Sequence, residues 1–207
     1  KEDVLVYRNS TDFLQTAGKV ATGSLRRRAQ WQNRYPEHEL TGLRGNMQTR
    51  LSKIEEEQLD AAIFAKAGLE RIGLLSDNHI VLDWMISAPA QGAIMITGRE
   101  EDAELRKICD AYNHKNTAIC CAVERDFMRT LEGGCTAPIG ASATLEGPSF
   151  HFKAGLFSLD GAKEIIWEDQ LKFEEVGQIS AIGEMAARHV LQNGGSEIME
   201  EIAKSLG

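Results

Sequence analysis

The feature that most constrains the fold is a regular alternation of short apolar runs and helical patterns over residues 19–71. The strand-like runs KVATGS, HELTGL and DAAIFAKAG are separated by the helical patterns LRRRAQWQNR and MQTRLSKIEEE. This alternation is typical of a parallel sheet covered by helices, because each helix carries the chain back to start the next strand in the same direction. In such folds, ligands bind at the carboxyl ends of the strands, where the following helices point their N-termini.

Two further runs, NHIVLDWM and GAIMITGRE, also have the composition of strands. The segment ISAPAQ between them is typical of a crossover rather than of a tight hairpin. A domain boundary is expected just after them, near Glu100, and we predict an α/β domain over residues 1–100.

The second half of the chain has a different pattern. Helices are predicted from Asp102 to Tyr112 and from Thr117 to Leu131, with Gly133 as a stop signal after the second. The strand candidates APIGASATL, SFHFKAGLF and KEIIWED follow, joined by turn signals at 146–148 and 160–161, which favours an antiparallel meander.

A further helix is predicted from about Glu175 to Leu191, ending at 193–195, and Ser196 is a candidate N-cap for a last helix. The predicted fold class is therefore α/β plus α+β. It consists of a parallel-sheet, periplasmic-binding-protein-like domain followed by a small domain, residues 101–207, with a three-stranded antiparallel sheet and helices.

The stretch RTLEGGCTAPIGA places Cys135 directly after two glycines and shortly before a proline. Since glycine lacks a Cβ, the loop can turn with positive φ and leave room for a bulky group at the sulfur. This indicates a reactive or modified thiol, although a small buried hydrophobic cysteine fits the same residues. The other cysteines, Cys109, Cys120 and Cys121, form no C-x-x-C pair and have no histidines at zinc-finger spacing. Metal and dithiol sites are therefore disfavoured, and a reducing cytoplasm is expected.

The charge is distributed unevenly. The net charge is −8, but residues 19–53 contain eight lysines and arginines against Glu37 and Glu39. An acidic protein with one basic segment and few interleaved aromatic residues favours small anionic ligands over nucleic acid. No apolar stretch approaches the roughly 20 residues of a membrane span, and no secretory signal is seen, so we expect a soluble protein.

Arginines recur where predicted strands pass into helices. Ser24 can cap the first helix, next to Arg26 and Arg27; Arg44 and Arg50 flank the start of the second, and Arg71 follows the third strand. Helix N-termini and guanidinium groups both attract carboxylates, so several such junctions along one sheet edge would select a ligand with several carboxylates. For each junction alone, a solvated basic helix face is the alternative interpretation.

Taken together, the stretches GSLRRRAQ, LRGNMQTRL, DAAIFAKAGLERIGL, AQGAIMI and ERDFMRTLEGGCTAPIGA resemble porphobilinogen deaminase, also called hydroxymethylbilane synthase, in order and spacing. The resemblance covers nearly the whole chain. It implies a cytoplasmic transferase of porphyrin, tetrapyrrole and haem biosynthesis. This family links four porphobilinogen molecules head to tail into hydroxymethylbilane, releasing ammonia, on a cysteine-linked dipyrromethane primer.

The resemblance also implies roles for individual residues. Cys135 would carry the dipyrromethane cofactor through a thioether, and each pyrrole would bring an acetate and a propionate to the arginines. The cofactor would be bound by Cys135, Ser24, Arg26, Arg27 and Arg44, and the substrate by Arg50, Arg71 and Gln91.

The sequence departs from the family pattern in two respects. Ala90 stands where the family usually has the first glycine of Gly-Gln-Gly-Ala. The family also has a further N-terminal region with an aspartate that stabilises the cationic pyrrole, and KEDVLVYR resembles the crossing out of that region. No acidic residue of this chain is therefore a candidate catalytic acid, and the chain is expected to be an inactive fragment without its cofactor.

The segment from about 85 to 100 would return to that N-terminal region, so it is expected to expose apolar surface or to be covered by a second copy of the chain. The complete enzyme is expected to be a monomer with no nucleic acid, metal or membrane partner. The competing functional hypothesis is a non-catalytic module that binds small polycarboxylates between two lobes.

Overall fold

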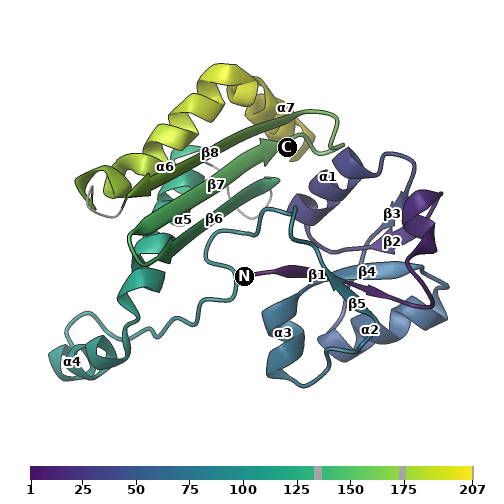
Figure 1. Ribbon diagram of the computed structural model, residues 1–207, viewed down its shortest axis with the longest axis horizontal. Helices are drawn as coiled ribbons and strands as arrows, with labels where there is room; N and C mark the ends of the chain where they lie inside the picture. The colour runs from purple at the N-terminus through teal and green to yellow at the C-terminus, as the bar shows by residue number, and fades with distance from the viewer. Residues whose placement is uncertain (133–136, 173–175, 207) are drawn as a thin grey trace.

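The computed structural model describes residues 1–132, 137–172 and 176–206, which form two sheets with their own helices (Figure 1). The first sheet has the strand order β3-β2-β4-β1-β5. Its strands are β1 (Asp3–Tyr7), β2 (Lys19–Ala21), β3 (Glu39–Thr41), β4 (Ala61–Ala65) and β5 (His79–Val81). Strand β2 pairs in parallel with β3 and β4, whereas β1 pairs antiparallel with β4 and β5.

Each parallel strand is followed by a helix, as the sequence pattern predicts. The helical segments of this half are η1 (Asp12–Gln15), α1 (Leu25–Arg34), α2 (Met47–Glu56) and α3 (Lys66–Arg71). Ser24 caps α1 by accepting a hydrogen bond from the Arg27 amide at 3.5 Å, and Asn46 caps α2 by accepting one from the Thr49 amide at 2.9 Å. Each cap satisfies a backbone N–H that has no partner inside the helix.

The sheet is mixed rather than purely parallel as predicted, because residues 3–7 form a strand, β1, that runs antiparallel to its neighbours. Strand β1 lies between β4 and β5, and Val4 and Leu5 are fully buried. Apolar side chains on both faces of a strand are typical of a central position in a sheet covered on both sides.

The predicted strand in GAIMITGRE is wrong. Residues 93–99 belong to no ladder, and the side chains of Ile94, Met95 and Ile96 are exposed by 78%, 65% and 60%. A strand needs a neighbour for its backbone hydrogen bonds, and within the described ranges none lies alongside this segment. The expected exposure of apolar surface here is confirmed.

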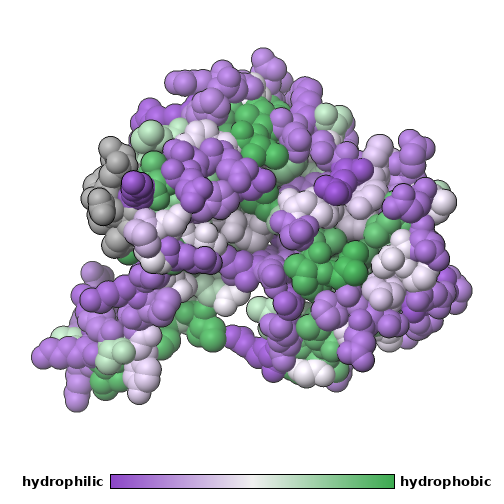
Figure 2. All heavy atoms as spheres, viewed as in Figure 1, coloured by the Kyte–Doolittle hydropathy of each residue, from purple (hydrophilic) through white to green (hydrophobic). Residues whose placement is uncertain are grey.

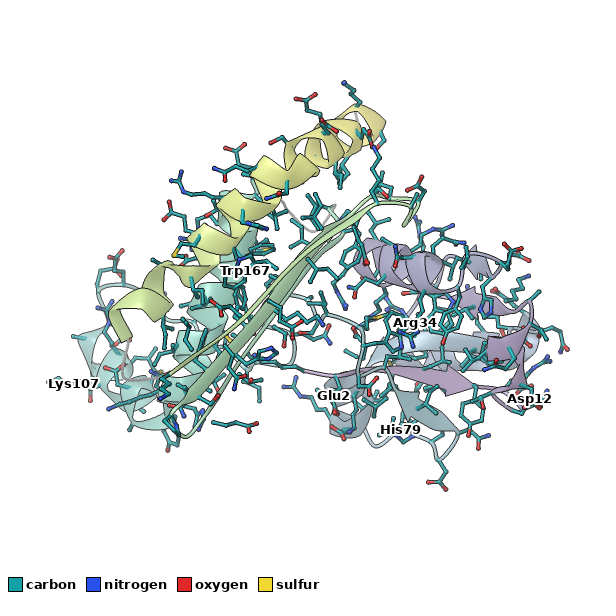
Figure 3. The ribbon with its side chains drawn as sticks, turned by 45° about the horizontal axis from the view of Figure 1, so that its top comes forward. Glu2, Asp12, Arg34, His79, Lys107 and Trp167 are labelled. Carbon is teal, nitrogen blue, oxygen red and sulfur yellow. The ribbon has the colours of Figure 1, made fainter. Side chains whose placement is uncertain are left out.

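The second sheet is the predicted antiparallel meander, with β6 (Ile139–Glu146), β7 (Ser149–Phe157) and β8 (Glu164–Lys172) in that order. The helices of this half are α4 (Ala103–Tyr112), α5 (Lys115–Thr130), α6 (Val176–Val190) and α7 (Ser196–Leu206). Helices α5 and α6 cover one face of the sheet (Figure 1), and their shared core includes Phe127, Phe150 and Phe152. Trp167 of β8 packs at the margin of this core (Figure 3).

Two details of this half concern its helices. Helix α4 projects away from both sheets, buries none of its residues and has apolar surface near its base (Figures 1 and 2). Ser196 is not an N-cap, because its backbone is helical and its hydroxyl donates to the Leu191 carbonyl at 3.3 Å. The preceding segment, η3 (Leu191–Gly195), bends at Gly194, whose φ of 103° favours glycine, so the chain passes from α6 to α7 without a free N-terminus.

Glu124 of α5 joins the two halves. Its carboxylate is completely buried and accepts hydrogen bonds from the amides of Ala90 (2.6 Å) and Ala143 (2.7 Å) and from Lys1 Nζ (2.5 Å). Lys1 Nζ also donates to the Ala143 carbonyl. One carboxylate thus connects α5 and β6 with Lys1, two residues before β1, and with the loop after β5.

A search of the described residues finds no helix long and apolar enough to cross a membrane.

Candidate functional site

The predicted site lies where β2, β3 and β4 end. These strands run in the same direction and are neighbours, so their carboxyl ends lie at one edge of the sheet and lead into α1, α2 and α3. We call this edge, with Arg26, Arg27, Arg44, Arg50 and Arg71, the arginine edge. The prediction that the three strand-to-helix junctions share one edge is confirmed, although Arg71 is the last residue of α3 rather than part of its first turn.

Arg26 and Arg27 converge on one buried carboxylate, that of Asp3 in β1. Arg26 donates from a terminal nitrogen to Asp3 Oδ2 at 2.7 Å, and Arg27 donates from Nε to Asp3 Oδ1 at 2.9 Å. A terminal nitrogen of Arg27 also lies 2.9 Å from Oδ1 as an ion pair. Adjacent helical residues point about 100° apart, so a partner from another strand is needed to bring the two guanidinium groups together. The Asp3 side chain is fully buried, which makes these bonds less screened than surface ion pairs.

Gln91 completes this cluster from the loop after β5. Its side-chain carbonyl accepts from Arg26 at 3.1 Å, and its amide donates to Asp3 Oδ1 at 3.0 Å and to the Lys1 carbonyl at 2.5 Å. Gln30 of α1 holds the same loop at Ile86. Its side-chain amide donates to the Ile86 carbonyl, and its side-chain oxygen accepts from the Ile86 amide. Gln91 is thus positioned beside the arginine pair.

The two arginines differ in how much of each side chain is exposed. Arg26 is buried to 5% exposure and also donates to the Ile86 carbonyl at 2.6 Å. Arg27 retains 14% exposure, so part of its guanidinium faces solvent. Burial lowers the pKa of Arg27, Asp3 raises it, and the positive charges of Arg26 and Arg50 lower it further.

The other arginines of the edge are more accessible. Arg50 is half-buried and donates from Nε to the Gly45 carbonyl at 2.7 Å, which orients it at the start of α2. Arg44 and Arg71 are exposed, and neither forms an ion pair with a residue of the described ranges. Ser24 is half-buried, and its hydroxyl is used in the α1 cap.

Cys135 lies outside the described residues, which stop at Glu132 and resume at Ala137. Two buried polar atoms near the arginine pair, Arg26 Nε and Ser87 Oγ, have no hydrogen-bond partner within the described part of the chain. Together with the free edge of Arg27, they leave hydrogen-bonding capacity for an anionic group. The arrangement therefore fits a cofactor with carboxylate side chains.

Sequence reasoning missed Asp3 and Glu124. A signal for Asp3 exists in DVLVY, because aspartate is disfavoured in strands and here it starts a fully apolar one. A signal for Glu124 exists in the helix pattern, where it shares the apolar face of α5 with Cys120 and Phe127. A carboxylate on a buried face requires hydrogen-bonding partners, but the sequence does not say which.

Comparison with known proteins gives consistent matches. The family model "Porphobilinogen deaminase, dipyromethane cofactor binding domain" matches residues 1–107, and the model of the "Porphobilinogen deaminase, C-terminal domain" matches residues 118–192. Among curated proteins, the porphobilinogen deaminase of Chlorobium phaeovibrioides is 36% identical over 98% of this chain and 66% of its own length. That of Listeria welshimeri is 38% identical over 94% of this chain and 63% of its own length. The chain therefore spans slightly less than two thirds of the length of these relatives.

Proposed function

Since the chain belongs to the porphobilinogen deaminase family, we propose that it contributes to the head-to-tail condensation of four porphobilinogen molecules into hydroxymethylbilane with release of ammonia. The observation that carries this proposal is the arginine edge, where three strand-to-helix junctions meet at one side of the sheet. Its guanidinium groups suit a substrate that is rich in carboxylates. Every pyrrole unit carries an acetate and a propionate, so the growing product is a polyanion.

The residues of the chain divide into two groups in this proposal. Arg27, Arg44, Arg50 and Arg71 have exposed or half-buried side chains that can reach ligand carboxylates. Arg26 and Gln91 are hydrogen-bonded to Asp3 beside Arg27, and we assign Arg26 to the cofactor and Gln91 to the substrate. Ser24 supports both arginines by capping α1. Charge-assisted hydrogen bonds of this kind contribute about 1.5–3 kcal/mol each where water is excluded.

We assign Cys135 as the attachment point of the dipyrromethane cofactor, on the glycines that precede it and on family membership. When bound, that group supplies the primer on which the product grows. The chain's own residues neutralise the carboxylates, orient the rings by their side arms, and limit repulsion as negative charge accumulates.

The test uses a chain extended to the full length of its relatives. Incubated with porphobilinogen, it is expected to release ammonia and to form hydroxymethylbilane, and its intact mass is expected to exceed that of the polypeptide by two pyrrole units. The 207 residues alone are expected to show no turnover, because about a third of the relatives' length lies outside the match. An extended chain without turnover contradicts the proposed reaction, and turnover by the 207 residues contradicts the assignment of an essential part outside them.

Substitution within the arginine edge tests which residues hold the product. In the extended chain, Arg27→Leu and Arg44→Leu are each expected to slow turnover on the order of tenfold to a hundredfold, since each removes one charge-assisted contact of about 1.5–3 kcal/mol. Enzyme-bound intermediates with fewer pyrroles are expected to accumulate and to be visible by intact mass.

The matched control for these variants is Arg188→Leu. Arg188 lies on the exposed face of α6 and pairs with Glu184 within its own helix. Turnover is expected to stay within a factor of two in the control. Full activity in both edge variants would show that the arginine edge does not bind the product.

The exposed apolar segment fits the same proposal. Residues 92–96, α4 and α5 line an open groove of about 640 Å³ that includes Cys109 and Cys121. We propose that this surface contacts the region of the relatives that lies outside the match. The 207 residues alone are therefore expected to self-associate through it. A cytoplasmic location, and a monomeric extended enzyme that binds neither nucleic acid nor membranes, complete the proposal.

A module that binds small polycarboxylates without catalysis is the second candidate. The arginine edge favours it equally, because reversible binding needs the same guanidinium groups. Carboxylate binding that is unchanged by Cys135→Ala, in an extended chain without turnover, is the result that would select this function.

A further inference from the structure

We propose that Asp3 is a positioning residue that arranges Arg26, Arg27 and Gln91 into the carboxylate-binding part of the arginine edge. The proposal rests on the proposed function in so far as the edge binds carboxylates. It adds a residue of β1, outside the strand-to-helix junctions, to the functional machinery.

The contacts of Asp3 carry the first step of the argument. Both of its oxygens are used: Oδ2 accepts from Arg26, and Oδ1 accepts from Arg27 Nε and from the Gln91 amide. A terminal nitrogen of Arg27 lies 2.9 Å from Oδ1 as an ion pair. These partners come from α1 and from the loop after β5, and Asp3 joins them from the start of β1, opposite the last residue of β4. A fully buried carboxylate that accepts three hydrogen bonds holds its partners in one geometry, because a partner that moved away would leave a buried polar group without a hydrogen bond.

The geometry of Arg27 carries the second step. Its Nε and one terminal nitrogen face Asp3, and its other terminal nitrogen lies 3.4 Å from the Ile63 carbonyl. The inner edge of the guanidinium is thereby occupied, and the 14% of the side chain that stays exposed belongs to a group whose orientation is set from inside. Pre-orientation lowers the entropy cost of binding a carboxylate, since arginine loses less rotamer freedom when the ligand arrives.

The third step of the argument uses charge, because a positioning role and simple electrostatic attraction predict opposite effects of Asp3 on anion binding. Arg26 and Arg27 together carry a charge of +2, and Asp3 lowers the net charge of the cluster to +1. If the edge attracted anions by charge alone, Asp3 would weaken binding and its removal would strengthen it. A positioning role predicts the opposite sign, which makes the two roles distinguishable in one measurement.

The first experiment needs no substitution. In the 207-residue chain, the guanidinium protons of Arg26 and Arg27 are expected to give separate, slowly exchanging NMR signals, because the bonds to Asp3 hinder rotation about the Nε–Cζ bond. Arg129, whose side chain is 76% exposed, is the internal reference and is expected to show averaged signals. Averaged signals for Arg27 would overturn the proposal whatever the behaviour of any variant.

The second experiment compares Asp3→Asn with Asp12→Asn by titration with citrate at constant ionic strength. Asp12 undergoes the same chemical change but is exposed in η1, at the end of the first half that is remote from the C-terminal half (Figure 3). Asp3→Asn is expected to weaken citrate binding at least fivefold despite the gain of one positive charge, and Asp12→Asn to leave it within a factor of two. Stronger or unchanged binding by folded Asp3→Asn would overturn the proposal.

Folding is monitored in parallel by circular dichroism, and Asp3→Glu serves as the conservative variant. Glutamate keeps the charge but moves the carboxylate by one methylene, so it is expected to restore separate guanidinium signals only in part and to bind citrate with intermediate affinity. Absence of citrate binding by the unsubstituted chain would count against the arginine edge and hence against the proposed function. The NMR signals of Arg26 and Arg27 would then decide the role of Asp3 on their own.

Discussion

Cys135→Ser, in a chain extended to the full length of its relatives, is expected to lose both the two additional pyrrole units and all measurable turnover. A serine hydroxyl is a far weaker nucleophile than a thiolate and cannot form the thioether, so no primer is attached. We expect turnover to fall on the order of a thousandfold or more, as is usual when a covalent attachment point is removed. Intact mass and hydroxymethylbilane formation measure the two effects separately.

Cys109→Ser is the matched control for this prediction. Cys109 is a half-buried free thiol on α4, so it tests whether any accessible sulfur accepts the cofactor. The control is expected to keep both the added mass and the turnover of the parent. If Cys135→Ser retained the added mass, the cofactor would be attached elsewhere and the assignment of Cys135 would be wrong.

The second large effect concerns stability. Glu124→Gln is expected to lower the free energy of unfolding by about 3–5 kcal/mol, the usual cost of removing one partner from a buried ion pair. Glutamine places an NH₂ group where the carboxylate now faces two backbone amides and the Lys1 ammonium, so donors meet donors. Urea unfolding followed by circular dichroism measures the change, which should appear in the midpoint more than in the slope.

Glu184→Gln provides the comparison for Glu124. Glu184 is exposed on α6 and pairs with Arg188 at 2.6 Å within the same helix. Surface pairs of this kind contribute about 0.3–0.5 kcal/mol, so the control variant should unfold almost at the midpoint of the parent. A Glu124→Gln protein as stable as this control would show that the two halves are held together by contacts other than the Glu124 carboxylate.

The local elements could be predicted because they depend on short-range chemistry. The LRRRAQWQNR segment forms α1 as expected, since Ser24 caps it and its buried residues Arg26, Ala29 and Gln30 recur at the i, i+3, i+4 spacing of a helix face. Strand β7 has the predicted bounds, and its inward residues Phe150, Phe152 and Ala154 alternate with more exposed ones. These patterns depend only on residues that are close together in the chain, so they can be found in a single sequence.

One segment was predicted wrongly and one strand was not predicted, because the structure of both segments depends on distant partners. Residues 3–7 and 93–99 have similar strand-like composition, but only the first finds neighbours, β4 and β5, for its backbone hydrogen bonds. Composition reports the tendency of a segment to form a strand. Whether a ladder forms depends on another strand being present in register alongside it.

From the sequence alone we obtained the order of the elements, the family resemblance and the arginines that follow three strands. Each of these follows from residue types and their spacing along the chain, which need no knowledge of long-range contacts. Only the tertiary structure decided which charges meet: Asp3 with Arg26 and Arg27, and Glu124 with Lys1, which is 123 positions away. A buried charge takes whichever opposite charge and hydrogen-bond donors the packing brings to it, and that choice is made across the fold rather than along the chain.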